Sequence, residues 1–152
     1  MRVCRAVVAF QFRAQVCTLV NDLARQFYWN IMPALFEYGA ERVLICDQQG
    51  NTIDSRQDAL DVIGDALGLG ATLIAIPVIR LSPAFFDLRS GLAGEIAQVA
   101  VNYRQKLAVV GNISEHVERS NALRDLVVEC NRRNDLWFVA TVEELRDRLT
   151  SR

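Results

Sequence analysis

The chain has 152 residues, the usual size of one domain with one continuous core. Hydrophobic residues make up 51% of it and charged residues 23%, a balance that excludes an intrinsically disordered chain. The formal net charge of -1 gives no electrostatic reason to expect nucleic acid or an anionic membrane as a partner.

Residues 1–31 differ in charge from the rest of the chain. They carry four arginines against a single acid, Asp22. This composition suits an amphipathic helix or a weak targeting peptide, and Met32 followed by Pro33 is also a natural start. We expect residues 1–31 to be an N-terminal extension or a loosely attached helix, and residues 32–152 to form a single α/β domain.

The four cysteines are widely spaced, with no C-x-x-C pair and no neighbouring histidine to complete a zinc site. They are Cys4, Cys17, Cys46 and Cys130. The spacing favours reduced thiols in a reducing compartment. We therefore expect a cytoplasmic protein that holds no metal and no cofactor.

From Glu41 onward, short branched apolar runs alternate with segments of helical period, which is typical of an α/β layer fold. Strands are predicted at residues 42–46, 72–76, 107–110 and 136–140. The turn-forming residues 47–51 predict a hairpin that returns through a short strand at Thr52 and Ile53. The expected fold is a central mixed sheet of about four to five strands with helices packed on it.

Capping residues set the bounds of the predicted helices. Ser55 and Asp58 cap the first helix, which ends at the glycines 68 and 70. Another helix spans residues 121–133, where Glu129 and Arg133 are spaced for a helical ion pair. A T-x-x-E capping box at residues 141–144 opens the last helix.

The helix that begins near residues 87–90 has an unusual first turn. Its apolar positions share one stripe that we expect to be buried: Leu92, Ile96, Val99 and Tyr103. Gly91 and Gly94 each cost about 1 kcal/mol relative to alanine inside a helix, so a close approach of another group explains them better than helix propensity. Something is expected to pack or bind tightly at this helix start.

Four polar residues, Asp87, Arg89, Ser90 and Glu95, surround that glycine-rich start. Backbone N–H groups and the helix dipole favour an anion there, Arg89 can add a bidentate contact, and Ser90 is a candidate phosphoacceptor. The alternative is purely structural: Asp87 and Ser90 cap the helix while two phenylalanines, 85 and 86, anchor the core. Further along, Glu95 and Asn102 fall on a polar stripe that is either a contact surface or simply solvated.

The usual enzyme signatures are missing: the sequence has no G-x-S-x-G elbow, no Walker loop and no H-E-x-x-H. His116 is the only histidine and follows a predicted strand, where a general base can lie. Alternatively, Asn112 or Ser114 caps a helical turn and His116 has no chemical role. An enzyme would be a small hydrolase or transferase using His116 with Asp87 or Glu95, which must then converge on one pocket.

A family resemblance is carried by the runs LSPAFFDLRSGLAGEIAQVAVNYRQKLAVVGNIS, ALRDLVVECNR and LWFVATVEEL. These runs resemble the bacterial family of domain of unknown function 4180, roughly from Glu41 to Leu149. The resemblance places residues 1–31 outside the family domain. Two departures are Asn112, where the family leads us to expect aspartate, and Cys130 with Arg133, which replace the serine and glycine of an ESNRG-like run.

The predicted order of elements is also similar to that of STAS domains, the fold of bacterial anti-sigma-factor antagonists. In those proteins a D-S-S-G-like loop opens the helix after the central strand, carries a phosphorylatable serine and docks a kinase-like partner. Asp87, Ser90, Gly91 and Leu92 occupy the comparable place, although Leu88 and Arg89 intervene, so only Ser90 keeps its position before the glycine. The resemblance implies a noncatalytic regulatory or protein-interaction module.

These observations favour binding of a protein partner or an anionic ligand at the helix start near Ser90, with small-molecule sensing as a further alternative. The candidate binding or switch residues are Asp87, Arg89, Ser90, Gly91, Gly94, Glu95, Asn102 and Ser114. We expect no nucleic acid and no membrane partner. The protein is expected to be a monomer or a homodimer, because an exposed edge strand permits pairing.

Overall fold

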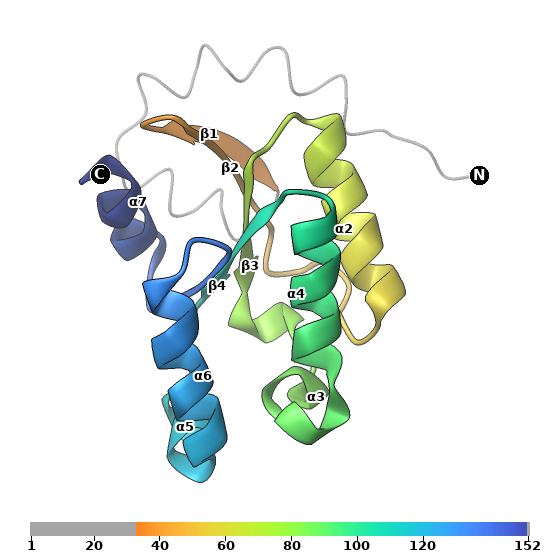
Figure 1. The fold of residues 1–152 in the computed structure, drawn as a ribbon. Coiled ribbons are helices and arrows are strands. Elements are labelled where there is room, and N and C mark those ends of the chain that lie inside the picture. Colours follow the sequence, from red (N-terminus) through yellow and green to blue (C-terminus); the bar gives the residue numbers. More distant parts are fainter. Residues whose placement is uncertain (1–32, 152) are drawn as a thin grey trace.

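The structure is a computed structural model that describes residues 33–151. The predicted N-terminal extension, with Cys4 and Cys17, therefore lies outside the described residues. Five strands form one sheet in the spatial order β1-β2-β3-β4-β5 (Figure 1). The strands are β1 Ala34–Tyr38, β2 Glu41–Ile45, β3 Leu73–Pro77, β4 Lys106–Val110 and β5 Leu136–Val139.

The sheet is mixed, as the sequence predicts. β1 and β2 pair antiparallel across a tight turn, with Tyr38 opposite Glu41 and Ala34 opposite Ile45. Gly39 lies in this turn with φ of 61°, a left-handed conformation that favours glycine. β2, β3, β4 and β5 all run parallel to one another. Together with the helices on the sheet, this arrangement confirms the α/β fold class.

The predicted return strand at Thr52 and Ile53 is wrong. Ile53 instead makes an isolated parallel bridge with Leu81, in which the Ile53 N–H donates to the Arg80 carbonyl at 2.7 Å. β2 is hydrogen-bonded to β1 on one side and to β3 on the other, so no place beside it remains for a return strand. The hairpin lies upstream, between β1 and β2.

Three helices cover one face of the sheet. They are α2 Arg56–Gly68, α4 Leu92–Asn102 and α6 Asn121–Arg132. Each follows one parallel strand and precedes the next in order across the sheet, and right-handed crossovers in one direction place all three on the same face. Figure 1 shows them side by side. Their inward residues include Ile63 of α2, Ile96 of α4 and Leu123 of α6, each at most 2% exposed.

The last helix, α7 Val142–Thr150, lies on the other face. Its Leu145 and Leu149 pack with sheet residues such as Val43 and Leu73. The capping box predicted at its start is confirmed, because Thr141 accepts from the Glu144 N–H at 3.2 Å and Glu144 Oε2 accepts from the Ala140 N–H at 2.8 Å. None of the described helices combines the length and apolarity needed to cross a membrane.

The apolar stripe of α4 is confirmed except at Tyr103. Leu92, Ile96 and Val99 are buried, whereas Tyr103 is 48% exposed. The helix ends at Asn102 and Tyr103 is its C-cap, whose N–H still donates to the Val99 carbonyl at 3.1 Å, so its side chain lies at the very end of the helix. Gln105, two residues on, is buried and donates to the Ala71 carbonyl at 3.1 Å.

Candidate functional site: the carboxyl edge of the sheet

The parallel strands β2 to β5 end at one edge of the sheet, which lies at the bottom of Figure 1. Short elements follow β3 there: η1 Val78–Arg80, α3 Pro83–Phe86 and η2 Leu88–Ser90. Helix α5 Ser114–Arg119 follows β4 at the same edge. Ligands of open α/β sheets bind outside the carboxyl ends of the strands, so this edge is the candidate site.

Asp87 and Ser90 are held by hydrogen bonds inside their own loop. The Asp87 carboxylate accepts from the Arg89 N–H at 3.1 Å and from Arg89 Nε at 3.2 Å. The Ser90 hydroxyl donates to the Ala84 carbonyl at 2.6 Å and accepts from the Leu92 N–H at 3.2 Å. These bonds cap η2 and connect α3 to the start of α4.

The same bonds weaken the case for an anion at this helix start. The backbone N–H groups of residues 89 to 92 donate in turn to Asp87 Oδ1, Asp87 O, Leu88 O and Ser90 Oγ. The side chain of Arg89, and then its backbone N–H, hold the pKa of Asp87 below its usual value, so its negative charge persists. At residues 89 to 92 the N–H donors already have acceptors and the Asp87 carboxylate lies beside them, and both features disfavour a further anion there.

Among the described residues, nothing makes the close approach expected at Gly91 and Gly94, since a Cβ at either position would meet no atom within 4 Å. Gly91 instead has φ of 78°, the left-handed conformation of a residue between two helical turns. The close approach occurs at Gly111, at the end of β4, where a Cβ would lie 3.0 Å from Val78 Cγ2. Gly111 thus lets the ends of β3 and β4 come together.

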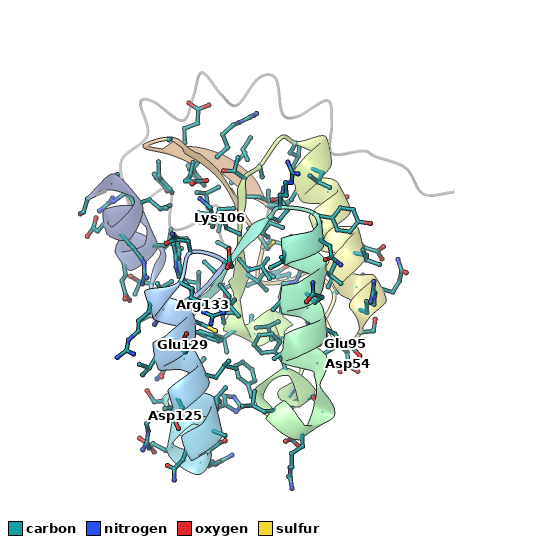
Figure 2. The ribbon with its side chains drawn as sticks, viewed as in Figure 1. Asp54, Glu95, Lys106, Asp125, Glu129 and Arg133 are labelled. Atoms are coloured by element: carbon teal, nitrogen blue, oxygen red, sulfur yellow. The ribbon has the colours of Figure 1, made fainter. Side chains whose placement is uncertain are left out.

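His116 stacks on Phe86 of α3, with ring centroids 4.1 Å apart and ring planes 11° from parallel. Within residues 33–151, no hydrogen bond or ion pair joins it to Asp87 or to Glu95. Glu95 is exposed on α4 (Figure 2). The convergence required by the hydrolase or transferase alternative is therefore not formed by hydrogen bonds among these side chains.

Two other predicted residues lie in separate places. The Ser114 N–H donates to Asn112 Oδ1 at 2.9 Å, so Asn112 holds the first residue of α5 at the candidate edge, while Ile113 is the N-cap. Asn102 accepts from Gln98 Nε2 at 2.9 Å and lies at the opposite end of α4. Asn102 therefore does not belong with the other candidate residues.

Two residues of η1 complete this edge and escaped the sequence analysis. Ile79 is 70% exposed, although it continues an apolar run that otherwise enters the core. Arg80 is only 9% exposed, and its Nε donates to the Asn51 carbonyl at 3.0 Å. The reversal of burial arises because η1 turns the chain off the line of β3, a change that alternation in the sequence did not signal.

The thiol of Cys46, directly after β2, is buried close to Arg80. Desolvation raises its pKa to about 12, and the positive charge of Arg80 opposes part of that rise. Such a thiol is protonated and unreactive at neutral pH. Across residues 33–151, no group of three histidine, cysteine or acidic side chains is placed to hold a metal ion.

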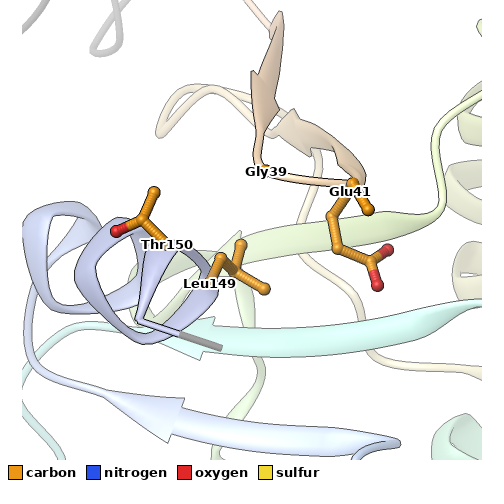
Figure 3. Close-up of a pocket in the computed structure, with 5 residues that line it drawn as sticks. Gly39, Glu41, Leu149 and Thr150 are labelled. Atoms are coloured by element: carbon orange, nitrogen blue, oxygen red, sulfur yellow. The ribbon is translucent and has the colours of Figure 1, made fainter.

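A hollow of about 300 Å³ lies at the opposite edge of the sheet, between the β1–β2 turn and the end of α7 (Figure 3). It is lined by Gly39, Ala40, Glu41, Leu149 and Thr150. Glu41 forms an ion pair with Lys106 and accepts from the Thr72 hydroxyl at 2.5 Å. None of the predicted site residues lines this hollow.

Comparison with known proteins gives one match. No curated protein and no solved structure is similar enough to the chain to be matched. The family described as Domain of unknown function (DUF4180) matches residues 38–149, which is more than half of the chain and contains the whole carboxyl edge described above. The chain therefore belongs to the DUF4180 family.

Proposed function

We propose that this protein is a noncatalytic, regulatory protein-interaction module that presents the carboxyl edge of β3 to a protein partner. The observation that carries the proposal is the exposure of Ile79, which is 70% exposed at the end of a buried strand. An isoleucine held out by a short helix next to polar loops resembles the apolar centre of a small protein interface.

Charged groups that follow the same strand support a protein partner. The Arg89 side chain is 92% exposed and its Asp87 partner 50% exposed, so both remain available at little desolvation cost. A partner with an apolar pocket for Ile79 and an acidic group for Arg89 would complement this edge. Phosphorylation of Ser90 would place about two negative charges beside Asp87 and disrupt such a contact.

No contact favours the enzyme alternative, because the only histidine stacks on Phe86 and has no acidic hydrogen-bond partner in the described residues. The hollow of Figure 3 lies at the other edge, so it gives no support to small-molecule sensing at the carboxyl edge. The local hydrogen bonds of residues 89–92 argue against a free anion as the ligand. A protein surface remains the best match to this edge.

The test compares quantitative affinity capture by the wild-type chain with capture by Ile79→Ser and Ser90→Asp, followed by titration with the purified partner. Val101→Ser is the matched control, because Val101 is also exposed, at 50%, but lies near the far end of α4. We expect Ile79→Ser to weaken binding at least about tenfold, as the loss of a buried isoleucine contact predicts. Ser90→Asp should weaken it through the negative charge added beside Asp87, and Val101→Ser should leave it unchanged.

Glu95→Ala tests whether the first turn of α4 belongs to the same interface. A partner bound equally by wild type, Ile79→Ser and Ser90→Asp would contradict the proposal. Circular dichroism spectra and melting temperatures of Ile79→Ser, Glu95→Ala and Val101→Ser should match the wild type, because these side chains are exposed. Ser90→Asp loses the hydrogen bond to the Ala84 carbonyl, so its effect on binding is measured at a temperature at which circular dichroism shows the variant folded.

A further inference from the structure

Arg80, at the end of η1, carries a buried positive charge that no described acidic side chain neutralises. It is 9% exposed, and the ion pairs within residues 33–151 are formed by other cations. Its hydrogen bond in this part of the chain runs from Nε to the Asn51 carbonyl, so its terminal nitrogens Nη1 and Nη2 donate to no described acceptor. Arginine is seldom buried in this way, because a charge removed from water without a counter-charge is strongly unfavourable.

The ionisable groups around Arg80 do not supply the counter-charge. Desolvation raises the pKa of the Cys46 thiol to about 12, and the charge of Arg80 lowers it in part, so this neighbour is uncharged at neutral pH. Asp47 and Asp65 affect the same thiol more weakly than Arg80 does. Neither carboxylate forms an ion pair or a hydrogen bond with Arg80 in the described structure.

A buried hydroxyl without a partner lies two residues further along the chain. Ser82 is 5% exposed, and its Oγ is enclosed with no hydrogen-bond partner among the described residues. Although Ser82 is the N-cap residue of α3, its side chain does not cap that helix. Buried hydroxyls in native proteins almost always have a partner, so this one points to a group that binds beside it.

The loop that follows β2 lies against both residues. The Ile53 N–H donates to the Arg80 carbonyl at 2.7 Å, and the Ser82 N–H donates to the Ile53 carbonyl at 3.2 Å. Gly50 lies directly on the guanidinium, where a Cβ would be 2.6 Å from Nη1. Both residues therefore lie at the carboxyl edge of the sheet, just beyond β3 (Figure 1), where open α/β sheets bind their ligands.

Burial and chemistry together define the ligand class. Nη1 and Nη2 of Arg80 are not among the enclosed atoms that lack a partner, so they keep a narrow access to solvent that admits only a small group. The planar guanidinium matches two oxygens of a carboxylate or a phosphate, and a hydroxyl can donate to the same anion. A neutral ligand would leave the charge of Arg80 uncompensated.

We propose that Arg80 and Ser82 form a binding site for a small oxyanion, a carboxylate or a phosphate, at the carboxyl end of β3. Nη1 and Nη2 donate to two oxygens of the anion, and the Ser82 hydroxyl donates to it as well. The site is distinct from the start of α4, where the N–H groups of residues 89–92 already have acceptors. It does not depend on the interaction proposed for Ile79.

Titration of the ¹⁵N-labelled full chain by NMR tests binding in the unmodified protein. Sodium phosphate and sodium acetate are the two probes, with sodium chloride at equal ionic strength as the reference. At least one probe is expected to shift the Arg80 Nε–H and Ser82 N–H resonances until they saturate, and the probe that does so identifies phosphate or carboxylate as the ligand class. The exposed Arg89 Nε–H is expected not to saturate. Absence of saturation at Arg80 with both probes, or equal shifts at Arg80 and Arg89, would overturn the proposal.

Ser82→Ala separates a ligand site from a purely structural role. Because it removes a buried hydroxyl without a partner, the urea midpoint of unfolding without added anion should stay the same or rise. The dissociation constant for the saturating anion should rise about tenfold, as expected for a lost hydrogen bond to a charged group. Ser151→Ala, which removes an exposed hydroxyl after α7, should leave that constant unchanged.

Two results with Ser82→Ala would contradict the site. An anion affinity equal to that of the wild type would exclude the hydroxyl from binding. A lower urea midpoint without anion would show that the hydroxyl stabilises the fold by itself. Either result overturns the proposal, whereas loss of partner binding by Ile79→Ser has no bearing on it.

Discussion

Arg80 shows how one buried charge depends on a glycine thirty residues away. Its guanidinium lies against the backbone of Gly50, where a Cβ would be 2.4 Å from Arg80 Cζ. The loop after β2 closes over this side chain at a residue without a Cβ, and a Cβ there would force the guanidinium to move. The hydrogen bond from Nε to the Asn51 carbonyl then compensates part of the cost of burying the charge.

Gly50→Ala should therefore destabilise the protein. The new methyl group forces the guanidinium to move and breaks its bond to Asn51, for a loss of about 1 to 3 kcal/mol in the free energy of unfolding measured with urea. Gly64→Ala is the control, since a Cβ there meets nothing within 4 Å and the site lies inside α2. Alanine at position 64 should stabilise by up to about 1 kcal/mol, and equal changes in both variants would contradict this account.

At the scale of elements, caps decide where helices begin. Ser55 accepts from the Asp58 N–H at 3.2 Å, and Ser120 does the same for Leu123 at 3.2 Å. The predicted pair between Glu129 and Arg133 is also present, at 3.0 Å on the exposed side of α6 (Figure 2). These features follow from residues three or four apart, so the sequence suffices to predict them.

Helix α7 depends on its cap more than α2, α4 and α6 do, because it has nine residues where they have 11 to 13, and because it is the described helix on the other face of the sheet. Thr141→Ala removes the acceptor of the Glu144 N–H and should lower the free energy of unfolding by about 1 kcal/mol. Thr52→Ala is the control, an exposed threonine outside any helix. If thermal or urea unfolding shows the same stability for both variants, the cap does not hold α7.

At the scale of the whole molecule, folding and ionisation of Cys46 are coupled. Its pKa is about 12 in the folded protein against 9.0 for an ordinary thiol, because burial disfavours the thiolate. Above pH 9 the unfolded chain loses this proton while the folded chain keeps it. The contribution to stability is thus complete below pH 9 and declines as the pH rises toward about 12.

The free energy of unfolding should fall between pH 8 and pH 10, by up to about 1.4 kcal/mol per pH unit from this thiol. Cys46→Ala should reduce the fall in the free energy of unfolding between pH 8 and pH 10. Cys130→Ala, at a half-buried position, should leave most of that fall unchanged. Urea titrations at both pH values give the comparison. Identical declines in wild type and Cys46→Ala would mean that other groups cause the pH dependence.

Four of the five strands of the sheet could be predicted from the sequence, and one could not. The predicted strands at residues 42–46, 72–76, 107–110 and 136–140 match β2 to β5 within a residue at each end. β1 escaped prediction because its five residues alternate weakly and adjoin the charged segment. Its role became evident only from its pairing with β2, a contact between strands that no local pattern records.

The candidate site was likewise predictable only in part. Sequence drew attention to residues 87–95, where glycines and capping residues cluster, but it could not tell whether the N–H groups there were available. The structure shows that the N–H groups of residues 89 to 92 donate to Asp87, Leu88 and Ser90, and it shows Ile79 exposed and Arg80 buried on the same turn. These outcomes depend on how the chain leaves β3 and on what it meets there.

By itself, the sequence determined the α/β class, the longer helices, the caps of α2 and α7 and the positions of strands β2 to β5, because periodicity and capping act between residues close in the chain. Only the tertiary structure decided the partner of β2, the bridge from Ile53 to Leu81 and the stacking of His116 on Phe86. Each of these joins segments well separated in sequence. Such contacts are selected by the packing of the whole molecule, which local preference does not encode.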